Sequence, residues 1–168
     1  MPIINMTKKN LYLLLLISML SGCTRDDICI PEIPKTPLLI VRFYDAQNPD
    51  NFKATTNFTV VKEGEEVALF APVSIDSIAI PLATSEDFTN YLFVNNATET
   101  VPDINFISFN YTRANEFISR ACSFRTNFND FSFLLDTTSS TSWIENIVLV
   151  TDSINVRNQH AAHIKIYH

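Results

Sequence analysis

The sequence predicts an all-β fold, a single antiparallel β-sandwich of immunoglobulin-like or jelly-roll kind, following an N-terminal lipoprotein signal peptide. Three observations favour the sandwich. Short runs of β-branched and aromatic residues recur at spacings of roughly 8–12 residues. No segment carries a long amphipathic helical pattern. Thirteen phenylalanines among 168 residues supply large rings for a core between two sheets.

The first expected strand covers residues 38–45, where LLIVRFYD is rich in β-branched and aromatic residues and is followed by the turn-like AQNPDN. Pro81 is expected to end its strand or to lie at a sheet edge. The chain holds only two glycines but sixteen asparagines, so Asn, Asp and Pro are expected to form the turns. Further strands are expected at residues 58–62, 67–70, 74–82, 90–96, 103–112, 131–135, 143–150, 153–156 and 163–168.

Residues 103–112 are apolar on both faces. Ile107, Phe109 and Tyr111 alternate on one face, whereas Ile104 and Phe106 share the other. Such two-sided apolarity predicts a central strand.

Residues 116–128 fit two patterns. A helix would align Phe117, Ile118, Ala121 and Cys122, and a strand would place Ile118, Arg120, Cys122 and Phe124 on one face. We favour the strand.

The N-terminus has the pattern of an export signal. Lys8 and Lys9 precede an apolar run from Leu11 to Leu20, which is shorter than the about 20 residues that a membrane-spanning helix needs. Leu20-Ser21-Gly22-Cys23 resembles a bacterial lipobox, in which cleavage precedes a cysteine that receives lipid. An ordinary signal peptide with a chance cysteine is the alternative.

Three regions follow from this interpretation. Residues 1–22 are the signal peptide, 23–37 a lipidated tether with a Pro-rich lead-in, and 38–168 the β-sandwich domain. Prolines at every third position of the lead-in favour polyproline II, as a spacer or as a PxxP ligand. Without residues 1–22 the chain has ten Lys and Arg against eighteen Asp and Glu. This charge disfavours nucleic acid and electrostatic docking on anionic lipid, so acyl chains on Cys23 are expected to hold the protein at the membrane.

Two cysteines then remain in an exported chain. We expect a disulfide between Cys29 and Cys122, because exported compartments are oxidising. Free thiols or a catalytic cysteine are the alternatives.

Several enzyme classes lack their motifs. Only Gly64 follows the signal peptide, so a phosphate-binding Gly-rich loop, a dinucleotide fingerprint and a nucleophile elbow are all missing, as are HExxH and paired CxxC. We therefore expect no enzyme activity, no cofactor, no nucleotide and no metal. A metal site at His160, His163 and His168 is less favoured than a solvated C-terminal strand.

The charged side chains are expected to be structural. Arg42, Arg120 and Arg125 are expected to pair with carboxylates such as Asp27 or Asp45, with anion binding as the alternative. Solvated loops are expected for Glu65-Glu66 and Glu86-Asp87, with a glycosidase dyad as the alternative. Trp143, Tyr91 and Tyr111 are expected in the core or packed against a sheet, with a glycan-binding face as the alternative.

The sequence also resembles a family of small lipoproteins from Bacteroidota, domain of unknown function 6452. The resemblance rests most specifically on Asp26-Asp27-Ile28-Cys29, Thr36-Pro37-Leu38-Leu39 and Ser119-Arg120-Ala121-Cys122. Many relatives have Gly where this chain has Ser123. The resemblance implies an envelope lipoprotein with a β-rich domain, and it implies no activity.

Two further patterns resemble signals of that lineage. Arg25-Asp26-Asp27 is similar to its signal for lipoprotein export to the cell surface. Asp76-Ser77-Ile78, Asp136-Thr137-Thr138 and Asp152-Ser153-Ile154 are similar to its O-glycosylation motif, which implies modification at Ser77, Thr137 and Ser153.

These observations lead to a functional expectation. The protein is expected to be an outer-membrane lipoprotein, periplasmic or surface-exposed, that acts as a non-catalytic binding or structural accessory to another envelope protein. A carbohydrate-binding surface lipoprotein is the alternative, and a carboxylate-dependent hydrolase is the less favoured one.

Overall fold

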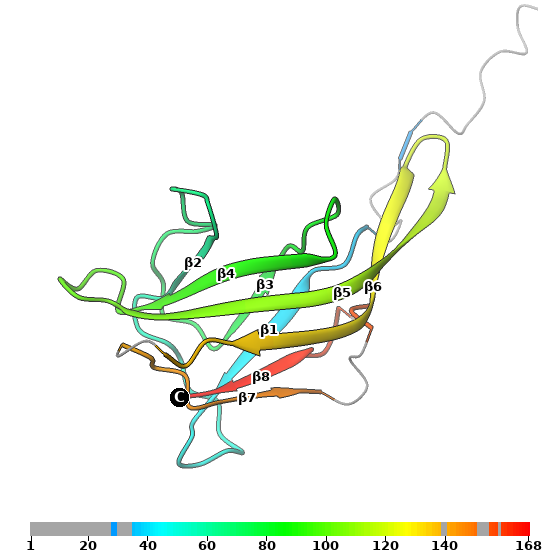
Figure 1. Cartoon of the computed structure of the whole chain (residues 1–168). Helices are drawn as coiled ribbons and strands as arrows, with labels where there is room; N and C mark the ends of the chain where they lie inside the picture. Colours follow the sequence, from blue (N-terminus) through cyan, green and yellow to red (C-terminus); the bar gives the residue numbers. More distant parts are fainter. Residues whose placement is uncertain (1–27, 30–34, 139–140, 151–154, 158) are drawn as a thin grey trace, which may run out of the picture. The chain divides into compact units, whose positions relative to one another are not determined.

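The computed structural model describes residues 28–29, 35–138, 141–150, 155–157 and 159–168 (Figure 1). The expected signal peptide, Cys23, Arg25 to Asp27 and Ser153 lie outside these residues. The described chain is all-β, with eight strands and no helix. The strands are β1 (Leu39–Tyr44), β2 (Thr59–Lys62), β3 (Ser77–Ile80), β4 (Phe88–Asn95), β5 (Asp103–Ser119), β6 (Ser123–Leu135), β7 (Asn146–Leu149) and β8 (Ile164–Tyr167).

The strands form two sheets of four. One sheet has the order β3-β1-β8-β7 and the other has the order β2-β4-β5-β6. The first and last strands, β1 and β8, are parallel, with Val41 opposite Ile164. The prediction of a purely antiparallel arrangement is therefore wrong at this pair. Side-chain alternation has the same period of two in both kinds of ladder, so the sequence pattern does not distinguish them.

The described residues divide into two compact units. The small unit contains residues 28–29 and Phe117–Phe124. The large unit lies within Pro34–Glu116 and Arg125–His168 and contains most of both sheets. Each unit is considered by itself below.

The core of the large unit receives side chains from both sheets. In β1, Leu39, Val41 and Phe43 are fully buried, and the Phe43 ring lies edge-on to Phe58 at 5.2 Å between centroids. Phe58 in turn meets Phe93 at 5.6 Å. The aromatic content of the sequence thus fills the space that the inner strand faces share, as expected.

The expected central strand is confirmed in β5. Ile107, Phe109 and Tyr111 are at most 4% exposed, whereas Ile104 and Phe106 on the other face are half-buried. β5 lies between β4 and β6, so both of its edges are hydrogen-bonded.

The expectation that Asn, Asp and Pro form the turns in place of glycine is confirmed for Asn at two positions outside the strands, Asn57 and Asn96. Asn57, Asn96 and Asp130 have positive φ angles of 43°, 53° and 51°, as does Gly64 at 82°. Short polar side chains tolerate this left-handed region better than other non-glycine residues. Asp130 falls inside β6.

Residues 116–128 form a hairpin. The preference for strand over helix is right, but the single face shared by Ile118, Arg120, Cys122 and Phe124 is wrong, because the chain reverses at residues 120–122 between β5 and β6. No Asn-Gly or Asp-Gly pair marks this turn, so the sequence lacks the usual hairpin signal.

The strand expected at residues 67–70 is absent. Ala68 forms only an isolated bridge with Val61, and Val67 is 79% exposed. The apolar run is too exposed to pack as a strand.

Candidate functional site

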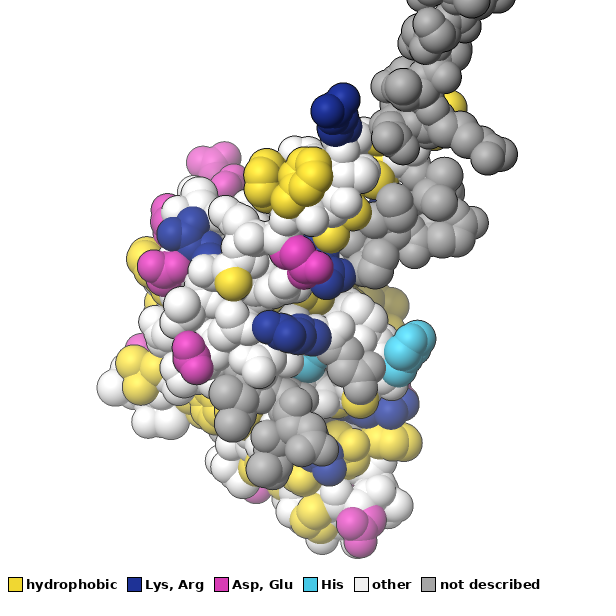
Figure 2. All heavy atoms as spheres, turned by 90° about the vertical axis from the view of Figure 1, so that its right-hand side faces the viewer, with side chains coloured by type: hydrophobic (Ala, Val, Ile, Leu, Met, Phe, Trp, Pro, Cys, Tyr) yellow, Lys and Arg dark blue, Asp and Glu magenta, His cyan; other side chains and the backbone are white. Residues whose placement is uncertain are grey.

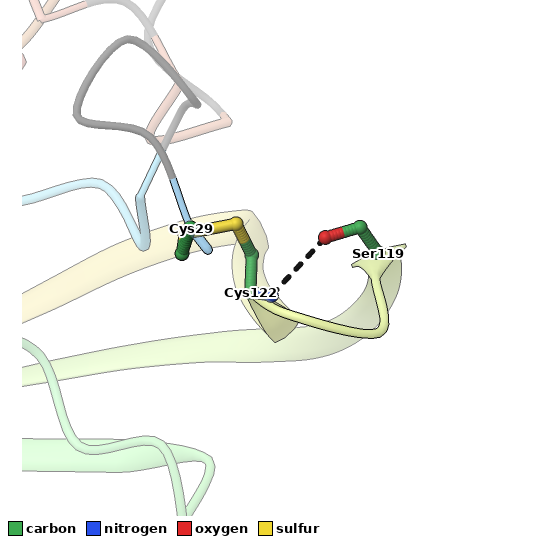
Figure 3. Close-up of a disulfide and its surroundings, with 3 residues drawn as sticks. All are labelled: Cys29, Ser119 and Cys122. Atoms are coloured by element: carbon green, nitrogen blue, oxygen red, sulfur yellow. Dashed lines mark hydrogen bonds between the residues drawn. A yellow bond between two sulfur atoms is a disulfide. The ribbon is translucent and has the colours of Figure 1, made fainter. Parts of the chain in front are cut away.

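The small unit is a hairpin tip closed by a disulfide. We use the name hairpin tip for Phe117–Phe124 together with Ile28 and Cys29. Cys29 and Cys122 form the disulfide predicted from the sequence, with 4.9 Å between their Cα atoms (Figure 3). The backbone N–H of Cys122 donates a hydrogen bond to the Ser119 hydroxyl at 3.1 Å, which secures the turn.

Large apolar side chains of the hairpin tip remain exposed. The rings of Phe117 and Phe124 meet edge-to-face at 5.3 Å, yet they are 56% and 62% exposed. Ile28, which precedes the disulfide, is 77% exposed. Sequence reasoning missed this cluster, because the two phenylalanines come together only when the chain reverses between them.

A second candidate site is a cationic pocket of about 200 Å³ on the large unit. We use this name for the pocket lined by Lys35, Pro37, Arg125, Asn127, Arg157 and Gln159. Three of the six lining residues are cations, although the chain has a formal net charge of −6. The face in Figure 2 shows Lys and Arg side chains next to carboxylates.

One carboxylate orients part of the cationic pocket. Arg125 donates from Nε and Nη2 to Glu116 Oε2 at 2.8 and 2.7 Å, and Asn127 donates to the same oxygen at 2.9 Å. The hydrogen bond from Asn127, followed by that from Arg125, lowers the pKa of Glu116. Arg157 donates to Asn129 Oδ1 at 3.0 Å. Lys35, Arg125 and Arg157 together exceed the charge of Glu116 by two, so the arrangement attracts anions.

Comparison with protein families identifies the chain at the level of its family. Residues 57–168 match the model of a family of unknown function (DUF6452). The chain belongs to this family. The DUF6452 match includes β2 to β8 and Cys122, whereas β1 and Cys29 precede it. No curated protein and no solved structure matches the chain.

In this DUF6452 member the expected pairing of arginines with carboxylates holds for Arg125 and fails for Arg42. Arg125 does form a structural ion pair, with Glu116. Arg42 does not pair with Asp45; its guanidinium carbon lies 4.0 Å from the centroid of the Phe52 ring. Its buried Nε has no hydrogen-bond partner among the described residues.

Asp45 pairs with a lysine instead of with Arg42. Its carboxylate lies 3.8 Å from Lys53 Nζ. The pKa of Asp45 is lowered, mainly by the hydrogen bond from the Asn48 side chain and then by that from the Gln47 N–H. Asp27, the other expected partner, lies outside the described residues.

The histidines are not all solvated, which corrects the expectation for the C-terminal strand. His160 is exposed, but His163 is 1% exposed, and the ring of His168 lies against Trp143 at 5.2 Å between centroids. Burial lowers the pKa of His168, although the carbonyl of Lys53 acts in the opposite direction. Within the described ranges, no group of three His, Cys, Asp or Glu is placed to hold a metal ion.

The expected core role of the aromatic residues is confirmed. Tyr91 and Tyr111 are 1% and 4% exposed, and the Trp143 Nε1–H donates to the Phe93 carbonyl at 3.1 Å. Burial raises the pKa of Tyr91 to about 12. These three rings therefore form no exposed platform for a sugar.

The carboxylate pairs lie in exposed loops, as expected. Glu65 and Glu66 are exposed, as is Glu86, and Asp87 accepts a hydrogen bond from Arg113 Nε at 2.7 Å. Where a carboxyl pKa is shifted in the described chain, it is lowered, at Asp45, Glu116 and Asp136. A general acid needs a shift in the opposite direction.

The three O-glycosylation-like residues differ in accessibility. Ser77 is half-buried in β3 and donates its hydroxyl to the Val41 carbonyl at 3.3 Å. Thr137 is exposed in the loop after β6. Ser153 lies outside the described residues. In the portions that the structure describes, no helix is both long and apolar enough to cross a membrane.

Proposed function

We propose that this protein is a lipid-anchored accessory of the outer membrane, whose β-sandwich binds another envelope protein without catalysis. Lipid on Cys23 provides the anchor, and Arg25-Asp26-Asp27 supports export toward the cell surface. The observation that carries the binding role is the cationic pocket. Lys35, Arg125 and Arg157 line it together, although the chain as a whole has a net negative charge.

The cationic pocket suits a carboxylate or another planar anion presented by a partner. Arginine donors form a rigid fork that matches carboxylate geometry. Glu116 accepts hydrogen bonds from two donors of Arg125, which holds the guanidinium in one orientation. Arg125 therefore loses less side-chain entropy when a partner binds. A partner with an acidic surface segment would also associate faster, because opposite charges steer the encounter.

The alternatives have less support. A carbohydrate-binding role had its best candidates in Trp143, Tyr91 and Tyr111, and these pack in or beside the core. A hydrolase would need carboxyl groups that converge with raised pKa values, and no shifted carboxyl of the described chain has a raised one.

Crosslinking in intact cells tests the binding role. Partners captured by the wild type are compared with those of Lys35→Gln/Arg157→Gln, which removes two exposed cations of the cationic pocket, and Lys62→Gln, which removes an exposed cation at the end of β2. We expect capture to fall roughly tenfold in the double variant and to persist in Lys62→Gln. Equal capture by all three proteins would refute a role for the pocket.

Metabolic labelling with radioactive palmitate tests the anchor. We expect label on the wild type and none on Cys23→Ser. An unlabelled wild type would rule out the lipid-anchored role.

A further inference from the structure

We propose that the hairpin tip is a membrane-contacting element, which inserts its exposed phenylalanines into the interface of the bilayer that holds the Cys23 lipid. This inference rests on the proposed lipid anchor and extends it: the bilayer contacts the folded chain as well as the acyl groups.

The covalent path between the anchor and the hairpin tip is short. Six residues lead from Cys23 to Cys29, and even a fully extended chain of that length spans only about 21 Å. The disulfide then brings the Cα of Cys122 within 4.9 Å of that of Cys29. Lipid on Cys23 therefore confines Cys122 to within about 26 Å of the bilayer surface, wherever the rest of the chain lies.

The exposed side chains of the hairpin tip suit a bilayer interface. Ile28, Phe117 and Phe124 are between 56% and 77% exposed, and they accompany the same disulfide. Single exposed apolar residues are common on protein surfaces, but large aromatic ones gathered at one tip mark an interaction site. Interfacial protein segments bury their apolar faces about 5–10 Å into the boundary between headgroups and acyl chains, and aromatic and aliphatic side chains form such faces.

The charge of the hairpin tip also fits. Its described residues include one cation, the exposed Arg120, and no Asp or Glu, in a chain whose formal net charge is −6. An arginine at the turn can donate to lipid phosphates while the neighbouring rings enter the apolar layer. The described residues of the hairpin tip therefore contribute no negative charge that would repel an anionic surface, and the nearest acidic residues in the sequence are Asp26 and Asp27, before Ile28, and Glu116, before Phe117.

Tryptophan fluorescence in vesicles containing brominated phospholipids tests the inference. The protein is purified from palmitate-labelled membranes and reconstituted as Phe124→Trp, as Leu134→Trp, and as the wild type, which corrects for Trp143. Leu134 is a matched control, because it also lies on β6 and is 68% exposed, compared with 62% for Phe124. A non-reducing gel verifies the disulfide in every sample.

We expect bromine to quench Trp at position 124 at least roughly twofold more than Trp at position 134, because bromine quenches only rings that reach the acyl layer. Equal quenching of the two tryptophans in palmitate-labelled protein would overturn the membrane contact but leave the lipid anchor unaffected. A protein crosslinked to the hairpin tip in cells would likewise overturn the membrane contact and leave the anchor unaffected. Absence of palmitate label would overturn the proposed function and this inference together.

Discussion

The Nδ1 atom of His163 accepts a hydrogen bond from the backbone N–H of Ile40 at 2.9 Å, and the backbone N–H of His163 donates to the Ile40 carbonyl at 2.8 Å. One histidine thus pairs with both polar groups of one β1 residue. Just upstream, the Gln159 side chain pairs with the N–H and the carbonyl of Leu38, both at 3.0 Å. Side chains therefore extend the parallel β1–β8 ladder before β8 itself begins.

Replacing His163 with Ala should destabilise the protein. The change removes a buried ring and leaves the Ile40 N–H without its acceptor, so we expect the free energy of unfolding to fall by about 2–4 kcal/mol. Urea unfolding measures the change. The control His160→Ala alters an exposed side chain and should stay within about 0.5 kcal/mol of the wild type. Similar losses in both variants would contradict the structural role of His163.

Asn105 should be needed to hold the loop before β7. It is fully buried in β5; its Oδ1 accepts from the N–H groups of Trp143 and Ile144 at 3.0 and 3.2 Å, and its Nδ2 donates to Ser142 at 2.7 Å. Asn105→Ala should lower the free energy of unfolding by about 3 kcal/mol, because buried donors lose their acceptor.

The matched control for Asn105 is Asn110→Ala, at an exposed position of the same strand. It should change stability by less than about 0.5 kcal/mol. Thermal unfolding of both variants provides the comparison, and an unaffected Asn105→Ala would show that the loop does not depend on this side chain.

Ser123→Gly should stabilise the protein. Ser123 begins β6 with a φ of 61°, in the left-handed region where a side chain with a Cβ atom is strained. Glycine relieves the strain, so we expect a gain of about 1 kcal/mol in the free energy of unfolding.

Ser132→Gly is the control for Ser123→Gly, since Ser132 is exposed in β6 and its φ is not positive. This change should cost about 0.5–1 kcal/mol, as glycine does in a regular strand. Denaturant unfolding with the disulfide intact distinguishes the two effects. If both changes destabilise the protein, the strain at Ser123 does not exist.

Removing the disulfide should cost stability, because the bond closes a long loop in the unfolded chain. Cys29 and Cys122 are 93 residues apart in sequence, and the chain-entropy model assigns a loop of that length about 4–5 kcal/mol. The double variant Cys29→Ser/Cys122→Ser should show this loss in urea unfolding, whereas Cys23→Ser should retain the disulfide. Identical mobility of wild type and Cys29→Ser on non-reducing gels would refute the bond.

Stability should decrease as the pH falls through the titration of His168. The pKa of His168 is lowered from 6.5, first because burial disfavours the imidazolium, so the unfolded chain binds this proton more readily than the folded one. The free energy of unfolding should therefore decrease as the pH drops below about 7, and the decrease should end below the folded pKa.

His168→Gln should remove that part of the pH dependence, and His160→Gln, at an exposed site, should retain it. Urea unfolding at pH 7.5, 6.5 and 5.5 tests the difference between the two variants. The window avoids Asp45, Glu116 and Asp136, whose lowered pKa values withdraw stability only at more acidic pH. Parallel pH profiles for both variants would contradict the prediction.

Much of the strand content could be predicted because each strand carries its own pattern. The alternation of Ile107, Phe109 and Tyr111 with more polar residues identified the buried face of β5. The failures occurred where local pattern and tertiary context disagree. Residues 67–70 are apolar enough for a strand, yet Val67 is exposed. A strand also needs a partner along its length, and this segment forms only an isolated bridge at Ala68.

The candidate sites were less predictable than the fold. Arg125 was expected to form an ion pair, and it does, but its neighbours Lys35 and Arg157 come from chain segments far apart in sequence. Phe117 and Phe124 were considered as parts of one helix or strand, whereas a reversal of the chain brings their rings together. Their exposure does not follow from their hydrophobicity, which on its own predicts burial.

The sequence by itself determined the all-β class, the aromatic core, the asparagine-rich turns and the pairing of Cys29 with Cys122, because these depend on local alternation, composition and cysteine count. Only the tertiary structure decided that β1 pairs in parallel with β8, that His163 is buried against Ile40, and that three cations share one pocket. Each of these involves residues far apart in the chain, and their proximity results from strand pairing and loop placement, which no local sequence pattern specifies.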